Sequence, residues 1–154
     1  MIKQTIYTIS LLLILHLLAA CSAEPQPIPY GQANCAHCNM TVADNRFGAE
    51  LVNDKGKAIF FDSAECLAAF VNEQPEQGNN AAYLMVTDYT NPNQIINARE
   101  AHFLQCRELP SPMGMFLTAY ADKGAAQKMQ QQHGGRLLNW NEVVLAVQKN
   151  EKPE

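Results

Sequence analysis

The order of the predicted secondary-structure segments constrains the fold of this chain more than any other feature. Residues 47–52 and 58–61 have the apolar and β-branched character of strands, and the glycine-containing segment 53–57 between them is typical of a hairpin turn. Apolar residues then recur at helical spacing over 63–73, and residues 82–87 return to a strand pattern. The first half of the chain is therefore predicted to follow the order strand, strand, helix, strand.

The same order returns in the second half of the sequence. Residues 101–106 and 115–121 are predicted strands, 122–133 is a predicted helix, and 136–138 is a short third strand. A final helix is predicted over 139–149. We therefore expect an α+β fold of two similar strand-strand-helix-strand halves with a C-terminal helix.

Polar residues mark the ends of the predicted helices. Asp62 precedes the first helix and Glu65 follows three residues later, which is the spacing of a capping box. Asn139 and Glu142 have the same spacing at the start of the final helix. Residues 75–80 begin with proline and are predicted to break the first helix.

The first 20 residues have the character of a secretory signal peptide. Lys3 provides a positive charge, and the apolar run 9–18 is too short to span a bilayer as a permanent helix. The run leads to Leu-Ala-Ala-Cys, which resembles bacterial lipoprotein signals that are cleaved before the cysteine, here Cys21. Acyl chains on Cys21 would anchor the protein without a transmembrane helix. The alternatives are an ordinary signal peptide and an uncleaved anchor.

A tether is predicted between Cys21 and the folded domain. Residues 22–29 contain three prolines, which favour an extended backbone. We assign the lipidated cysteine and the tether to 21–34 and a single domain to 35–150. Ser22 is not the aspartate that retains lipoproteins at the inner membrane. The predicted location is therefore the periplasmic side of a bacterial membrane, with the outer membrane favoured over the inner one.

The mature chain is acidic. Without Lys3, 10 basic residues stand against 15 acidic residues, which is a formal net charge of −5. A nucleic-acid partner is not predicted, because such proteins need a basic surface. The sequence also has no glycine-rich phosphate loop and no recognisable nucleophile motif, so no enzymatic activity is predicted.

The segment Cys35-Ala-His-Cys-Asn-Met40 combines two thiols, an imidazole and a thioether. Thiols and thioethers are soft donors, which favour Cu(I) over hard cations. In an extended segment, Cys38 and Met40 would point to the same side and bind one ion together. His37 is either a ligand, a neighbour of the ligands or a solvated side chain. The alternatives are a structural or surface lipoprotein, with either a Cys35–Cys38 disulfide or half of a structural zinc site, and a thiol oxidoreductase.

Other sulfur-containing residues lie far from this segment in the sequence. Met113 lies among prolines and a glycine in a stiff loop, where it is either a further ligand or a packing residue. Met115 begins an apolar strand and is predicted to be buried. Cys66 falls in the first turn of the predicted helix, where the helix dipole would lower the pKa of its thiol. Cys66 is either an auxiliary sulfur or a small packing residue, and the packing role is favoured.

In several of these segments the chain resembles the NosL family, the copper-binding lipoproteins associated with maturation of nitrous oxide reductase. The resemblance covers nearly the whole mature chain. The matching segments are the lipoprotein signal ending in Cys21, the segment Cys35-Ala-His-Cys-Asn-Met40, residues 57–67, Ser111-Pro-Met-Gly114, and residues 134–143.

This resemblance implies a fold, a cargo and a partner. Members of the family fold as two strand-strand-helix-strand halves related to the C-terminal fold of organomercurial lyase. They bind Cu(I) outside the cytoplasmic membrane and are associated with its delivery to nitrous oxide reductase. By position, the resemblance implies Cys38 and Met40 as the core of a Cu(I) site, Met113 as a third ligand and Cys35 as an alternative sulfur. The chain is accordingly expected to be a membrane-anchored Cu(I) chaperone with a copper enzyme as its client.

Overall fold

The computed structural model describes residues 23–153. The predicted signal peptide and the predicted lipidation site at Cys21 lie outside the described residues. The helices and strands are, in chain order, β1 (Ala49–Val52), β2 (Ala58–Phe61), α2 (Ala64–Glu73), α3 (Pro75–Asn79), β3 (Tyr83–Asp88), β4 (Asn91–Asn97), β5 (His102–Gln105), β6 (Leu117–Tyr120), α4 (Lys123–His133), β7 (Arg136–Leu138) and α5 (Trp140–Lys149).

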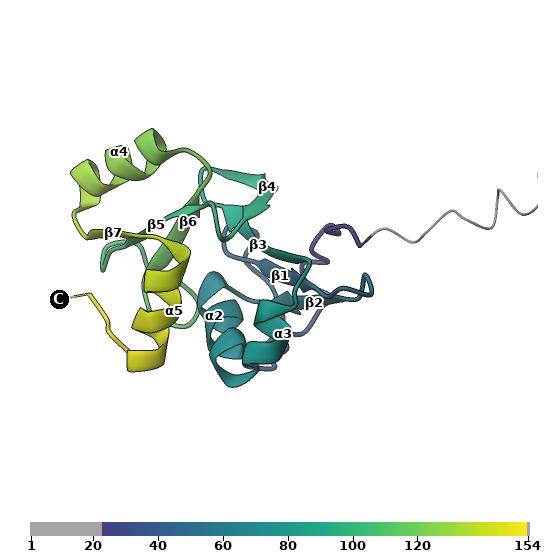
Figure 1. Cartoon of the computed structure of the whole chain (residues 1–154). Coiled ribbons are helices and arrows are strands. Elements are labelled where there is room, and N and C mark those ends of the chain that lie inside the picture. Colours follow the sequence, from purple (N-terminus) through teal and green to yellow (C-terminus); the bar gives the residue numbers. More distant parts are fainter. Residues whose placement is uncertain (1–22, 154) are drawn as a thin grey trace, which may run out of the picture.

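Two antiparallel sheets, one from each half of the chain, confirm the predicted α+β fold with two similar halves (Figure 1). The strand order is β2-β1-β3-β4 in the first sheet and β6-β5-β7 in the second. In both sheets the first strand of the half pairs with the second strand on one side and with the third on the other. The two halves therefore share one topology, to which the first half adds β4.

Helix α2 connects the two halves. It follows β2 in the first half, yet it contacts β6 of the second sheet and packs against α5 (Figure 1). The Asn72 side-chain amide donates a hydrogen bond of 3.0 Å to the carbonyl oxygen of Val144 between these two helices. One hydrophobic core consequently contains residues of both sheets and both helices, among them Leu51, Leu67 and Phe103.

The second sheet is covered on both faces. Phe103 belongs to the main core with Trp140 of α5, whereas Leu104 packs with Tyr120 and Ala126 of the smaller cluster beneath α4. Successive residues of a strand point to opposite faces, so β5 separates α4 from α5 (Figure 1). Full burial of such apolar side chains contributes about 1.5–3 kcal/mol each to folding.

The capping residue of α2 differs from the prediction. Ser63, not Asp62, is the N-cap, and its hydroxyl accepts a hydrogen bond from the backbone N–H of Cys66. The expected capping box at Asp62 and Glu65 is therefore wrong, and the Glu65 carboxylate reaches a loop of the other half instead. At α5 the predicted capping box between Asn139 and Glu142 is confirmed.

Two elements were absent from the sequence prediction. Residues 75–80 were expected only to break a helix, but Pro75 is the first residue of the short helix α3. A proline fits there because the first turn needs no donor from its nitrogen. Strand β4 is mostly polar and partly exposed at a sheet edge, so it lacks the apolar alternation on which strand prediction depends.

Part of the predicted tether contacts the first sheet. The backbone N–H of Gln26 donates to both carboxylate oxygens of Glu50, at 3.0 and 3.1 Å. Ile28 is buried in the main core, and the Tyr30 hydroxyl lies 2.9 Å from the Thr87 hydroxyl. Residues 26–30 are thus ordered against the domain before the cysteine segment begins.

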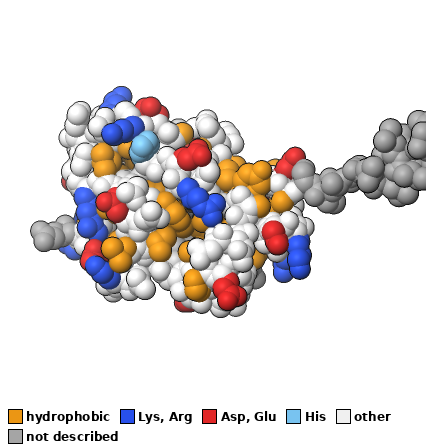
Figure 2. Space-filling model, in the orientation of Figure 1, with side chains coloured by type: hydrophobic (Ala, Val, Ile, Leu, Met, Phe, Trp, Pro, Cys, Tyr) orange, Lys and Arg blue, Asp and Glu red, His pale blue; other side chains and the backbone are white. Residues whose placement is uncertain are grey.

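The surface combines apolar and charged side chains. On the face shown in Figure 2, hydrophobic side chains form a band across the centre, and side chains of both charges lie around it. No helix in the described part of the chain has the length and apolar character needed to cross a membrane.

Candidate metal site

The segment from Cys35 to Met40 is a tight turn. The backbone N–H of Cys35 donates to the Met40 carbonyl oxygen at 2.8 Å, and the N–H of Asn39 donates to the Cys35 carbonyl oxygen at 2.9 Å. Asn39 has a φ of +64°, in the left-handed region. The expectation that Cys38 and Met40 lie on one side of an extended strand is therefore wrong, because the chain reverses between them.

The turn brings Cys35 and Cys38 next to Cys66 of α2. The three Sγ atoms all lie within 4.8 Å of one another, and we call these residues the cysteine cluster. Cys35 and Cys66 are buried, whereas Cys38 is partly exposed. A metal bonded to three sulfurs at about 2.3 Å places the sulfurs roughly 4 Å apart. The cluster therefore needs little contraction to hold one ion.

Two local features place the cluster. The backbone N–H of Ala36 donates to the Phe60 carbonyl oxygen at 3.0 Å, which fixes the turn against β2. The Ser63 cap then starts α2 immediately after β2, so that Cys66 lies in its first turn beside the same strand. Cys66 was favoured as a packing residue, but the structure places its sulfur among those of the cluster.

Hydrogen bonds favour the thiolate of Cys35. The Cys66 thiol donates to the Cys35 sulfur, and backbone N–H groups of Cys38, Asp62 and His37 also donate to it, which lowers the pKa of Cys35 to about 4. The same contact and burial raise the pKa of Cys66. The sequence-based expectation of a lowered pKa for Cys66 is thus wrong, because Cys35 carries the negative charge that the helix dipole was expected to place on Cys66. Burial raises the pKa of Cys38.

We predict that Cys35 is a thiolate at neutral pH in the metal-free, reduced chain. The pKa of Cys35 falls from the ordinary value of 9.0 to about 4 on folding, so its ionisation stabilises the folded state fully above pH 9. This stabilisation is lost as the pH falls toward 4. Thiolate absorbance in the ultraviolet should titrate near pH 4 in the wild type. Absorbance that titrates only near pH 9, or that is unchanged in a Cys35→Ser variant, would contradict the assignment.

A pocket of about 270 Å³ lies beside the cluster. It brings Cys66 together with Met113, which was predicted from the sequence as a distant donor. Met113 is 37% exposed and Met40 is 46% exposed, so both thioethers are accessible to solvent, whereas Met115 is buried as expected. The pocket is lined by His37, Glu65, Cys66, Ala69, Glu73, Met113, Met115, Val147 and Asn150.

His37 points an imidazole nitrogen at a carboxylate. Its Nδ1 lies 3.3 Å from an Oε atom of Glu73 in the same pocket. A carboxylate on one ring nitrogen is the arrangement that orients the other nitrogen of metal-binding histidines. His37 therefore lines the same pocket as Cys66, with its Nδ1 directed at Glu73.

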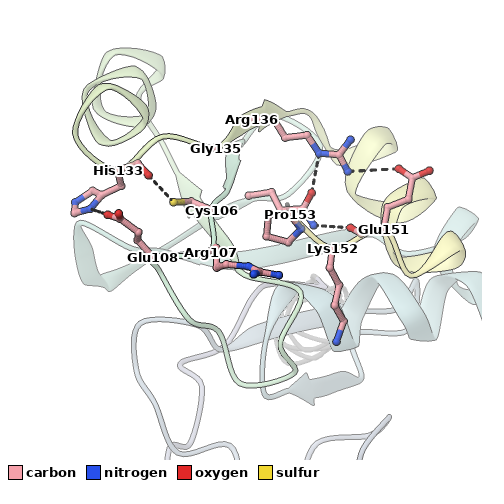
Figure 3. Close-up of a pocket in the computed structure, with 10 residues that line it drawn as sticks. Cys106, Arg107, Glu108, His133, Gly135, Arg136, Glu151, Lys152 and Pro153 are labelled. Carbon is pink, nitrogen blue, oxygen red and sulfur yellow. Dashed lines mark hydrogen bonds and ion pairs between the residues drawn. The ribbon is translucent and has the colours of Figure 1, made fainter.

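A second pocket of about 810 Å³ lies in the other half and contains none of the cluster cysteines (Figure 3). Its side chains are largely paired with one another. The Cys106 thiol donates to the His133 carbonyl oxygen at 3.1 Å, and Arg136 donates to the side chains of Gln105 and Glu151. Cys106 is thus a buried thiol engaged away from the cluster.

Fold and site together define a class: a small α+β domain of two similar halves that carries a thiol cluster suited to a soft metal ion. The chain belongs to the NosL family, whose model matches residues 29–147. Its fold is similar to the crystal structure of the copper chaperone NosL from Shewanella denitrificans, with a TM-score of 0.65 and 24% sequence identity. The match covers 79% of this chain and 96% of that chain. No curated protein matches the sequence.

Proposed function

We propose that this chain binds Cu(I) at the cysteine cluster and delivers it to a copper enzyme outside the cytoplasm. The observation that carries the proposal is the convergence of three cysteine sulfurs within 4.8 Å. Thiolates are soft ligands that suit Cu(I). Membership of the NosL family and the description of the similar structure as a copper chaperone support the same cargo.

Sulfur atoms from three segments supply the proposed ligands. The sulfurs of Cys35, Cys38 and Cys66 hold the ion, which adds Cys66 to the residues predicted from the sequence. Met113 adds a thioether from the pocket that it shares with Cys66, and Met40 offers another at the exposed side of the turn. Because thioethers are neutral and bind without losing a proton, they can exchange more easily than thiolates.

Exposure of the donors suggests how copper leaves. Cys35 and Cys66 are 1% exposed, whereas Cys38 is partly exposed and both methionines are exposed. A client protein can therefore reach the outer donors first and replace them one at a time by its own sulfur or imidazole ligands. Copper is transferred by ligand exchange, and the chain performs no catalytic turnover.

The client and the location follow from the family resemblance and the N-terminal sequence. We propose nitrous oxide reductase as the client and a lipid anchor at Cys21 that holds the domain on the periplasmic side of a bacterial membrane, with the outer membrane favoured. The proline-containing segment that follows Cys21 would provide the reach between anchor and site.

The proposal is tested by titrating the full-length chain, reduced and in detergent, with Cu(I) against a competing chelator. Replacing both Cys38 by serine and Met40 by alanine should weaken binding by at least about a hundredfold, because removal of supporting groups alone costs about 10–100-fold. Loaded wild type should also pass copper to metal-free nitrous oxide reductase.

Three results would contradict the proposal. The first is a wild-type affinity in the Cys38→Ser, Met40→Ala variant. The second is a wild-type chain that takes up zinc in preference to Cu(I), which would indicate a structural zinc site. The third is a Cys35–Cys38 disulfide that resists mild reductant, although both are free thiols in the structure.

A further inference from the structure

A buried carboxylate joins the cysteine-bearing helix to the methionine-bearing loop. Glu65 precedes Cys66 in α2 and is only 2% exposed. One of its carboxylate oxygens accepts hydrogen bonds from the Ser111 hydroxyl and, at 3.3 Å, from the backbone N–H of Leu117. The other accepts a 3.0 Å hydrogen bond from the backbone N–H of Met113. Glu65 therefore binds the loop directly at the methionine.

The interaction is unusual because buried carboxylates are normally paired with cations. In the described part of the chain, the partners of Glu65 are hydroxyl and backbone N–H donors, with no ion pair. In a buried site such hydrogen bonds are stronger than in water. The carboxyl group of Glu65 thus joins this loop to α2.

Ser111 extends the same network along the loop. Its hydroxyl oxygen accepts hydrogen bonds from the backbone N–H of Phe116 at 2.7 Å and of Leu117 at 3.3 Å. Gly114 and Phe116 both have positive φ angles, of +71° and +61°, so the backbone here is sharply folded. A residue of the first half therefore determines the conformation of a loop in the second half.

We infer that Glu65 is a positioning residue for Cu(I), which holds the Met113 thioether toward the Cys66 thiol across the pocket that both line. This inference rests on the proposed function. Groups that orient metal ligands contribute about 10–100-fold to metal affinity. Glu65 connects the two halves of the site in this way, and Cu(I) retention depends on it although it is not a ligand.

The test is a double-mutant cycle on the full-length chain in detergent, with Cu(I) affinity measured against a competing chelator. Glu65→Gln keeps the shape of the side chain but replaces one acceptor oxygen by an amide donor. We expect it to weaken Cu(I) binding about tenfold. In a Met113→Leu background the same change should have no further effect, because the thioether that Glu65 positions is already gone.

Two further variants separate positioning from loss of stability. Glu50→Gln alters another fully buried carboxylate that accepts backbone hydrogen bonds, from Gln26, and it should keep wild-type affinity. Ser111→Ala removes one donor to Glu65 and should weaken binding in the same direction as Glu65→Gln. Thermal unfolding of each metal-free variant gives the fraction of folded protein. Each Cu(I) affinity is then calculated per folded molecule.

Two outcomes overturn the inference alone: wild-type affinity in Glu65→Gln, or an effect of Glu65→Gln that persists in full when Met113 is leucine. If Glu65→Gln does not fold, wild-type affinity in Ser111→Ala overturns it. A wild-type chain that binds no Cu(I) overturns the proposed function, and the inference with it.

Discussion

Serine in place of Cys66 is expected to weaken Cu(I) binding by more than about a hundredfold. Cys66 supplies one of the three sulfurs that lie within 4.8 Å of one another, and a hydroxyl is a poor ligand for a soft ion. The substitution also removes the thiol that donates to Cys35. Competition with a Cu(I) chelator of known affinity measures the effect.

Cys106→Ser is the matched control for this prediction. Cys106 is 2% exposed, so it is as fully buried as Cys66, but its thiol donates to the His133 carbonyl oxygen far from the cluster. We expect this variant to keep wild-type affinity. Equal losses of Cu(I) affinity in both variants would mean that a buried thiol affects binding only through the stability of the fold. Wild-type affinity in Cys66→Ser would show that Cys66 is not a ligand.

Alanine in place of Gly135 is expected to lower the free energy of unfolding by about 3–5 kcal/mol, since backbone strain and overpacking each cost about 1–3 kcal/mol. Gly135 has a φ of +91°, and a Cβ atom there would lie 2.3 Å from the Gln105 carbonyl oxygen. The contact is with backbone of the central strand β5, which cannot move aside without breaking its pairing. Denaturant unfolding monitored by circular dichroism gives the value.

Gly134 provides the comparison for this second prediction. It has a φ of +74°, but a Cβ atom at this position would meet nothing within 4 Å. Gly134→Ala should therefore cost only the backbone strain, about 1–3 kcal/mol. If the two variants lose equal stability, the close approach of Gly135 to β5 does not contribute to the loss in free energy of unfolding.

Local sequence signals predicted much of the fold. Asn139 and Glu142 cap α5 as expected because a capping box depends only on residues three positions apart. At α2 two neighbouring polar residues competed for the cap, and the sequence analysis assigned Asp62 where the hydroxyl of Ser63 makes the bond. Strand β4 was missed because it lies at a sheet edge and lacks the alternation of apolar and polar residues.

The site was harder to predict because its ligands come from different elements. Cys35 and Cys38 are neighbours in sequence, so their proximity was visible. Met113 was a candidate because of its stiff proline- and glycine-containing loop, and the family resemblance implied it as a third ligand. Cys66 lay 28 positions beyond Cys38 with only a buried helical environment as a signal. A cysteine in the first turn of a helix, directly after a strand that adjoins the cysteine turn, is the pattern that would have identified it.

X-ray absorption of Cu(I)-loaded wild type and Cys66→Ser tests the central claim, that the sulfurs of the cysteine cluster share one copper ion. The wild type should show a first shell made of sulfur alone, with at least three sulfurs, and the variant should show one sulfur fewer. An identical sulfur count in the two proteins, or nitrogen in the wild-type shell, would contradict a copper site centred on Cys35, Cys38 and Cys66.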